Sequence, residues 1–223
     1  MLQPTEQAVA QHGGQLELHP HFVTPIYVSY RPDFLPSVRK ASIESLDVVR
    51  KIRPNNDMNP SVMSEDLMGN PALDSFSEYA GMSAWNILSE QGYQMQDFRV
   101  QFSELWAQEH HKYSSMDQHI HGLGAQIVGF YFMDVPEKSS NAVFHDTRSG
   151  CLQGNLPRFP TNEVKISSNA VNYEPEPGMF IFTNAWLAHS FTKHASESPL
   201  RFIHFNLIAA PVTQQGLPKV EVI

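Results

Sequence analysis

The chain of 223 residues is 41% hydrophobic and 17% charged, a composition typical of a globular domain that excludes a disordered or fibrous protein. Its net charge of −8 argues against general binding to nucleic acids or anionic membranes, because such binding needs a basic face. The single cysteine, Cys151, excludes an intrachain disulfide and a zinc site built from several cysteines. The first residues lack the pattern of a signal peptide, and no apolar run approaches the ~18 residues of a membrane span. We therefore expect a cytoplasmic protein that does not enter a membrane.

The first part of the sequence predicts one strand and two helices. The strand covers residues 21–30, which are rich in β-branched and aromatic side chains, and the helices cover 33–52 and 70–92, with a loop at 55–69 between them. Asn70 is the expected capping residue of the second helix, and Pro71 occupies its first position.

The remainder of the sequence is typical of a β protein. Short apolar segments separated by Pro, Gly, Ser and Asn predict strands at 98–108, 119–133, 142–144, 178–182, 187–192 and 201–209. Residues 146–176 are irregular, and loops of that length often carry function. The order of elements predicts an α+β, mainly β fold, in which the strands form a sandwich or a rolled barrel and the helices cover one outer face.

A pair of histidines begins the predicted strand at 119–133. His119 and His121 are two residues apart, and side chains at that spacing project from the same face of a strand. Two neighbouring imidazoles can chelate one divalent ion, whereas two histidines exposed in a loop are the structural alternative.

Two further residues follow later in the chain. His189 comes after a Pro-Gly turn and an apolar strand, and Arg201 opens the segment RFIHFNLIA twelve residues beyond it. An arginine on a strand made for burial is costly unless it meets an anion, and its guanidinium matches a carboxylate bidentately. The alternative is an arginine at the end of a strand with its charged group in water.

These segments resemble the iron(II)- and 2-oxoglutarate-dependent oxygenases, in particular a small prolyl-hydroxylase-like group found among bacterial and phage proteins. The resemblance spans most of the chain and depends on the order and spacing of its pieces. The pieces are HFVTPIYVSY, ELWAQEH, HIHGLGAQIVGFYFMDVPE, VFHDTR, PEPGMFIFTNAWLAHSF and RFIHFN.

The resemblance implies a double-stranded β-helix, or jelly roll, in a single domain over residues 1–223. Within it, 1–97 would hold the N-terminal strand and support helices, 98–210 the jelly-roll core and 211–223 a tail. His119 and His189 would bind Fe(II), Arg201 would hold the far carboxylate of 2-oxoglutarate, and the Tyr131 hydroxyl would contact the same carboxylate. The implied reaction hydroxylates a C–H bond and releases succinate and CO2.

The sequence departs from the family pattern at the third ligand. The family motif is His-x-Asp or His-x-Glu, which gives two histidines and one carboxylate, whereas this chain has His121 at that position. We favour three histidine ligands, and we predict that iron with three neutral ligands would be neutralised by dianionic 2-oxoglutarate. The alternatives are that His121 lies behind the ligands while Asp117 or Asp146 binds, or that metal binding has been lost.

Other side chains are interpreted as structural or peripheral. Trp106 and Trp186 are expected in the core with Phe180, Phe182 and Phe191, and Asn206 is expected to be a buried amide. The pair His110 and His111 lies in a polar stretch and is expected to be solvated. His145 and Arg148 border the irregular loop and could contact substrate.

Two other functions remain open from the sequence. A cupin also uses His-x-His, and Gln126 lies where a cupin has a carboxylate, but His189 follows Gly178 by eleven residues, which fits a cupin poorly. A jelly roll can also serve as an interaction module without catalysis. For both the oxygenase and the cupin, the expected partner is an unidentified small molecule or peptide. Exposed strand edges would also allow a homodimer.

Overall fold

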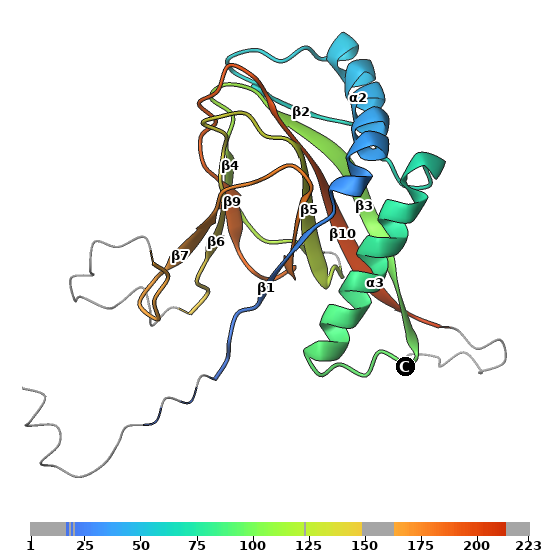
Figure 1. Ribbon diagram of the computed structural model, residues 1–223, viewed down its shortest axis with the longest axis vertical. Helices are drawn as coiled ribbons and strands as arrows, with labels where there is room; N and C mark the ends of the chain where they lie inside the picture. The colour runs from blue at the N-terminus through green and yellow to red at the C-terminus, as the bar shows by residue number, and fades with distance from the viewer. Residues whose placement is uncertain (1–16, 18, 20, 123, 149–162, 213–223) are drawn as a thin grey trace, which may run out of the picture.

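The computed structural model describes residues 17, 19, 21–122, 124–148 and 163–212. These residues form two antiparallel sheets and two α-helices (Figure 1), as the mainly β prediction requires. The tail predicted at 211–223 falls outside the described residues from 213 onward, as does Cys151. No helix among the described residues is long and apolar enough to cross a bilayer.

The larger sheet has six strands in the order β1-β8-β5-β10-β3-β2. Its strands are β1 (Ile26–Tyr30), β8 (Met179–Asn184), β5 (Ile127–Asp134), β10 (Leu200–Pro211), β3 (Phe98–His110) and β2 (Ser61–Met63). The smaller sheet has the order β4-β9-β6-β7. Its strands are β4 (Met116–His119), β9 (His189–Phe191), β6 (Ala142–His145) and β7 (Ala170–Tyr173).

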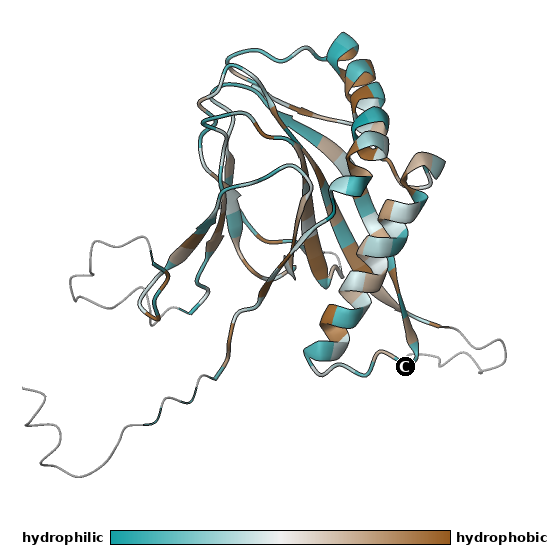
Figure 2. Cartoon of the chain, in the orientation of Figure 1, coloured by the Kyte–Doolittle hydropathy of each residue, from teal (hydrophilic) through white to brown (hydrophobic). Residues whose placement is uncertain are grey.

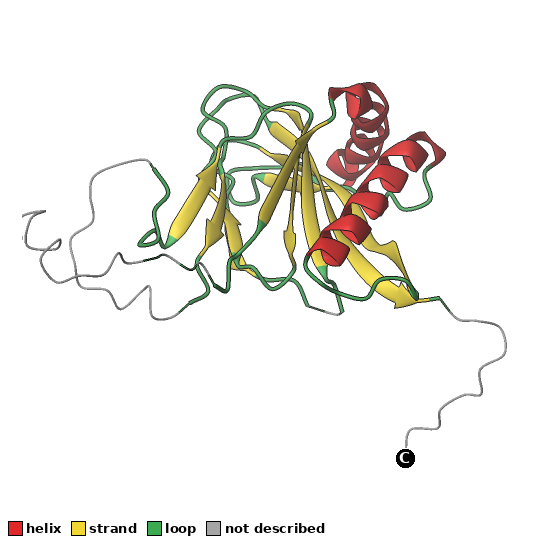
Figure 3. Ribbon diagram, turned by 60° about the horizontal axis from the view of Figure 1, so that its bottom comes forward, coloured by secondary structure: helices red, strands yellow, loops and turns green. Residues whose placement is uncertain are grey.

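Both predicted helices are present, each preceded by a short 3-10 turn. Helix α2 (Leu35–Ile52) follows η1 (Pro32–Phe34), and α3 (Asp74–Glu90) follows η2 (Pro71–Leu73). The Asn70 side chain accepts a hydrogen bond of 3.0 Å from the backbone N–H of Ala72, so it caps the 3-10 turn η2 that leads into α3 rather than α3 itself. Both helices lie on the same face of the larger sheet, as Figures 1 and 3 show and as the prediction required.

The larger sheet is buried on both faces, so two apolar cores result. The outer core lies between this sheet and the helices, and the inner core lies between the two sheets. The strands at the centre of the molecule accordingly carry many apolar residues, coloured brown in Figure 2. Along β10 the two cores alternate: Phe202 faces the inner core, whereas Ile203 and Phe205 face the helices.

The structure corrects several predicted boundaries. The strand predicted at 119–133 is two strands, β4 and β5, because a turn closed by the Ala125 N–H and the Gly122 carbonyl (3.1 Å) interrupts it, and Gly124 has a φ of 84°. The strand predicted at 21–30 begins only at Ile26, directly after Pro25, which has no N–H to donate to a ladder. The segments read as loops at 55–69 and 146–176 contain the short strands β2 and β7.

Candidate metal centre

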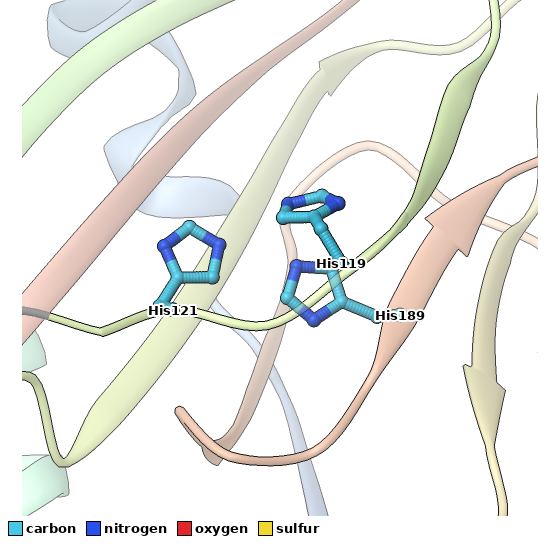
Figure 4. A group of neighbouring side chains, drawn as sticks. All are labelled: His119, His121 and His189. Atoms are coloured by element: carbon cyan, nitrogen blue, oxygen red, sulfur yellow. The ribbon is translucent and has the colours of Figure 1, made fainter.

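Three histidines from separate segments meet between the sheets. His119 and His189 are directly opposed in the antiparallel pair of β4 and β9, and their ring centroids are 4.4 Å apart. His121 lies in the loop after β4, where its backbone N–H donates to the Ala185 carbonyl at 2.9 Å. Its ring centroid is 5.1 Å from each of the other two, and Figure 4 shows the three rings close together. One nitrogen of each ring can be chosen so that all three atoms lie within 4.8 Å of one another.

The hydrogen bonds of the rings leave nitrogen atoms free to bind a metal. The Nδ1 atom of His119 lies 2.7 Å from the Asp117 carbonyl, and that of His189 lies 3.0 Å from the Leu187 carbonyl. A carbonyl only accepts, so each Nδ1 carries the proton and each Nε2 keeps its lone pair. The Nε2 atoms of His121 and His189 are buried and have no partner in the described structure. Buried, unpartnered nitrogens that converge in this way fit the donor set of a divalent transition metal.

Burial also keeps two of these rings neutral. Desolvation, the largest cause, and the neighbouring imidazoles together lower the pKa of His189 to about 3, against the raising effect of its hydrogen bond to Leu187. Desolvation and then the charge of His119 lower the pKa of His121 to about 4, against an opposing contribution from Glu104. Both side chains are therefore neutral at pH 7, the form in which imidazole binds a metal.

The carboxylates considered as alternative ligands lie elsewhere. The one group of candidate ligands found among the described residues consists of the three histidines and contains no carboxylate. Asp117 contributes its backbone carbonyl to His119, and its residue is exposed. Asp146 accepts hydrogen bonds from Arg148, 2.6 Å from its Nη2. The geometry thus favours His121 as the third ligand.

Arg201 and Tyr131 are not brought to this centre. Arg201 lies on the helix side of β10, where its Nε donates to Glu109 at 2.5 Å and its Nη1 donates to Asp134 at 3.1 Å. The Tyr131 hydroxyl donates to the Arg31 carbonyl at 2.8 Å, and its ring packs on Phe180 in the outer core. Both positions follow from strand alternation, which turns them away from the inner core. The predicted roles of these two residues in holding 2-oxoglutarate therefore lack support from their placement.

A second group of polar side chains lies beside the three histidines, and its central member, His204, was not singled out from the sequence. His204 of β10 is buried and both of its ring nitrogens lack partners; its centroid is 4.9 Å from that of His121. The Trp106 ring of β3 lies 4.3 Å from the His204 ring, and its Nε1 is also buried and unpartnered. Asn206 is buried as predicted and donates to Glu104, while its Oδ1 has no partner. The signal available in the sequence was the spacing of Phe202, His204 and Asn206, which share one face of a strand.

Several peripheral predictions are settled by the same placement. His110 is fully buried, with its ring 5.2 Å from Phe202, so the expectation that it is solvated is wrong; burial lowers its pKa to about 3. Trp186 is 48% exposed, so its assignment to the core is also wrong. The core assignment is confirmed for Phe180, Phe182 and Phe191.

His145 and Arg148 line a pocket of about 460 Å³ together with residues of the N-terminal segment. Two of its other wall residues, Leu187 and Phe144, lie close to the three histidines. The Leu187 carbonyl accepts from the His189 ring, and the centroid of the Phe144 ring is 6.2 Å from that of His189. The predicted contact of His145 and Arg148 with a substrate therefore stays a prediction.

Comparison with known proteins supports the chemistry of the centre. Residues 104–206 match the model of a family described as "Putative 2OG-Fe(II) oxygenase", and this match includes the three histidines and His204. No curated protein matches the sequence.

Solved structures share the fold at low sequence identity. AviO1 from Streptomyces viridochromogenes Tue57 is 12% identical with a TM-score of 0.56, and 88% of this chain and 92% of that chain are covered. A prolyl-4-hydroxylase from Pseudomonas putida is 8% identical with a TM-score of 0.55, over 82% of this chain and 92% of that one. HygX from Streptomyces hygroscopicus, solved with nickel, 2-oxoglutarate and hygromycin B bound, is 12% identical with a TM-score of 0.51, over 82% of each chain. The segment 104–206, which contains the three histidines, is thus similar to the 2OG-Fe(II) oxygenases, the family that the sequence resembles.

Proposed function

We propose that the chain is an iron(II)- and 2-oxoglutarate-dependent dioxygenase that hydroxylates a C–H bond of a small molecule or peptide. The two facing sheets would form the jelly-roll core of this enzyme. One observation carries the proposal: three histidine side chains converge with ligand atoms within 4.8 Å of one another, inside the segment that matches the family. The likeness to solved structures supports the fold, but at this low sequence identity it does not identify the substrate.

In the proposed enzyme His119, His121 and His189 hold the iron. The carbonyls of Asp117 and Leu187 fix the tautomer and orientation of two of these rings. When bound, iron(II) and 2-oxoglutarate supply the oxidising chemistry, in which dioxygen is consumed, succinate and CO2 are released and a C–H bond is hydroxylated. The protein contributes the positions of the ligands and the apolar inner core, which excludes water around them.

The chain also offers groups that could bind 2-oxoglutarate without Arg201. The buried N–H of Trp106 and the ring of His204 lie beside His121 and have no protein partner. Buried polar groups without partners are costly, and carboxylate oxygens would satisfy them. We propose that these two side chains, rather than Arg201, contact the bound 2-oxoglutarate.

A second function is favoured by the same observation about Arg201. Because its guanidinium is already paired with two carboxylates, the metal centre could serve a cupin-like enzyme or binding module that does not use 2-oxoglutarate. The non-catalytic module, in turn, requires that no metal binds at all. The three functions differ in what the protein binds, so binding measurements separate them.

The deciding experiment is an anaerobic titration of the full chain, purified without a histidine tag, with iron(II) and then with 2-oxoglutarate. The proposed function predicts one iron per chain and a weak visible charge-transfer band when 2-oxoglutarate is added. Iron binding without the band would favour the cupin-like centre, and absence of iron binding would favour the non-catalytic module.

Matched variants test the ligands in the same titration. His189→Ala should lose the iron, whereas His145→Ala should keep it, because His145 binds Ser190 and lies outside the group of ligands. His121→Ala should weaken iron binding, and His121→Asp should restore it by supplying the carboxylate of the family motif. If Asp117→Asn abolished iron binding instead, the assignment of His121 would be wrong.

A further inference from the structure

A second pocket, of about 530 Å³, shares no lining residue with the His145 pocket. It lies where the end of α3, the segment before β3, the loop between β4 and β5 and the end of β10 meet. His121 forms part of its wall, so a molecule in this pocket would lie against the metal centre. The volume is that of a site for a small organic molecule.

The wall of this pocket contains no Asp, Glu, Lys or Arg side chain among the described residues. The pocket at His145, by contrast, is lined by Asp146, Arg148 and Lys165. A charged ligand that left water for the pocket at His121 would find no opposite charge on its wall, and transfer of an unpaired charge is strongly unfavourable. The wall therefore favours an uncharged ligand.

Aromatic side chains at the rim are left exposed without a protein partner for much of their surface. Tyr93 is 60% exposed, Trp186 48% and Phe98 37%, and all three line the pocket. Exposed aromatic rings gathered around a concave site are typical of ligand binding, because a flat ring can stack on them. This arrangement favours a ligand that carries a ring.

The amides of the wall are mostly occupied. Asn184 and Gln91 bind each other through both side-chain amides, at 2.9 and 3.1 Å. The Oε1 atom of Gln126 accepts from the Ala209 N–H at 2.7 Å, which leaves its Nε2 without a partner among the described residues. Gln126 can therefore donate a hydrogen bond to an acceptor oxygen of a ligand.

We propose that this pocket binds the substrate and that the substrate is an uncharged, ring-bearing organic molecule with a hydrogen-bond acceptor. The proposal rests on the proposed function for the identity of the ligand as a substrate. The recognition chemistry itself depends only on the uncharged wall, the aromatic rim and the Gln126 donor.

The test uses three probes that share one ring system: 2-naphthamide, which is uncharged, 2-naphthoate, an anion, and 2-naphthylmethylammonium, a cation. Their dissociation constants for the metal-free full chain are measured by saturation-transfer NMR and tryptophan fluorescence. We expect 2-naphthamide to bind about tenfold more tightly than either charged probe, because only the charged probes lose hydration without compensation. Equal or tighter binding of a charged probe would overturn the proposal.

A matched pair of variants locates the binding. Gln94 and Gln96 are both exposed and two residues apart, but only Gln94 lines the pocket. Gln94→Lys should therefore improve the binding of 2-naphthoate several-fold relative to 2-naphthamide, and Gln96→Lys should change that ratio little. Trp186→Ala should weaken 2-naphthamide about tenfold through loss of ring stacking. Identical behaviour of the two lysine variants would place the probe elsewhere.

Manganese(II) separates this proposal from the proposed function. If Mn(II) occupies the histidines, it should broaden the NMR signals of bound 2-naphthamide, and His189→Ala should abolish the broadening. Selective probe binding without any Mn(II) binding would refute the metal centre and leave the uncharged pocket intact. Mn(II) binding without selective probe binding would refute the pocket alone.

Discussion

Replacement of Arg201 by alanine distinguishes a structural arginine from one that binds 2-oxoglutarate. The structure places its guanidinium between Asp134 and Glu109, whose side chain is fully buried and is also held by Arg50 at 2.7 and 2.8 Å. Burial alone would raise the pKa of Glu109, but the hydrogen bonds from Arg50 and then Arg201 outweigh it, so this pKa lies below its usual range. Arg201→Ala should therefore act on stability.

The magnitude follows from the two contacts. Loss of the hydrogen bond to the buried carboxylate costs about 1.5–3 kcal/mol, the range for bonds to charged groups. Loss of the contact to the partly exposed Asp134 adds about 0.2–1 kcal/mol. Since Arg50 still neutralises Glu109, we expect a total of about 2–3 kcal/mol, which corresponds to a fall in Tm of about 5–10 °C for a domain of this size.

Calorimetric unfolding of the metal-free protein measures this loss. Arg53→Ala is the matched control, because Arg53 is exposed and its replacement removes the same charge. The lowered pKa of Glu109 sets the sign of the pH dependence: the stabilisation is present above the usual glutamate range and is lost as the pH falls through the folded-state pKa. The Tm values of wild type and Arg201→Ala should thus converge in acid. An unchanged Tm combined with a large loss of 2-oxoglutarate affinity would refute the structural role.

Three further substitutions probe the inner face and the sheet. His204→Phe should raise the Tm of the metal-free protein by a few degrees, because it removes two buried unpartnered nitrogens, yet should weaken 2-oxoglutarate in the anaerobic titration; unchanged affinity would contradict the proposed contact. Burial lowers the pKa of His110 to about 3, so its neutral form stabilises the fold fully above the unfolded-state pKa and progressively less as the pH falls below it. His110→Leu should accordingly flatten the loss of stability between pH 7 and pH 4, by at most about 1.4 kcal/mol per pH unit, and an equally steep loss would refute this. Gly129→Ala should destabilise by about 1–3 kcal/mol in urea unfolding, because a Cβ there would lie 2.2 Å from the Phe205 ring; a neutral effect would show that the ring can move.

The sequence predicts that the three histidines come together, but the reason for their convergence differs from the predicted one. The i, i+2 argument requires one strand through His119 and His121, but β4 ends at His119 and His121 lies in a loop. Its ring still joins the group because its backbone is held by the Ala185 carbonyl. That bond, like the register that sets His119 opposite His189, joins segments about seventy residues apart, which local patterns do not encode.

The difference between the predicted and the observed side of β10 for Arg201 has another cause. Strand alternation assigns faces only when one face is polar, whereas β10 is apolar on both sides: Phe202 packs inward and Ile203 packs against the helices. The spacing in RFIHFN therefore shows which residues share a face, but not which of the two faces lies toward the three histidines. The same two-sided burial explains why His110, in a stretch that looks solvated, lies in the inner core.

The placement of Arg201 away from the histidines and the presence of a third histidine are related through charge. A family site with one carboxylate ligand leaves iron(II) with a net charge of +1, whereas three neutral imidazoles leave it at +2. Dianionic 2-oxoglutarate would neutralise the latter centre completely, and its carboxylates would then need hydrogen-bond donors more than a further cation. The inner face beside His121 supplies such donors in Trp106 and His204. On this reasoning His121→Asp should keep iron but bind 2-oxoglutarate more weakly than wild type, because the complex would then carry a net negative charge in an apolar core. Tighter binding of 2-oxoglutarate by His121→Asp in the anaerobic titration would show that the charge of the ligand set does not govern the affinity.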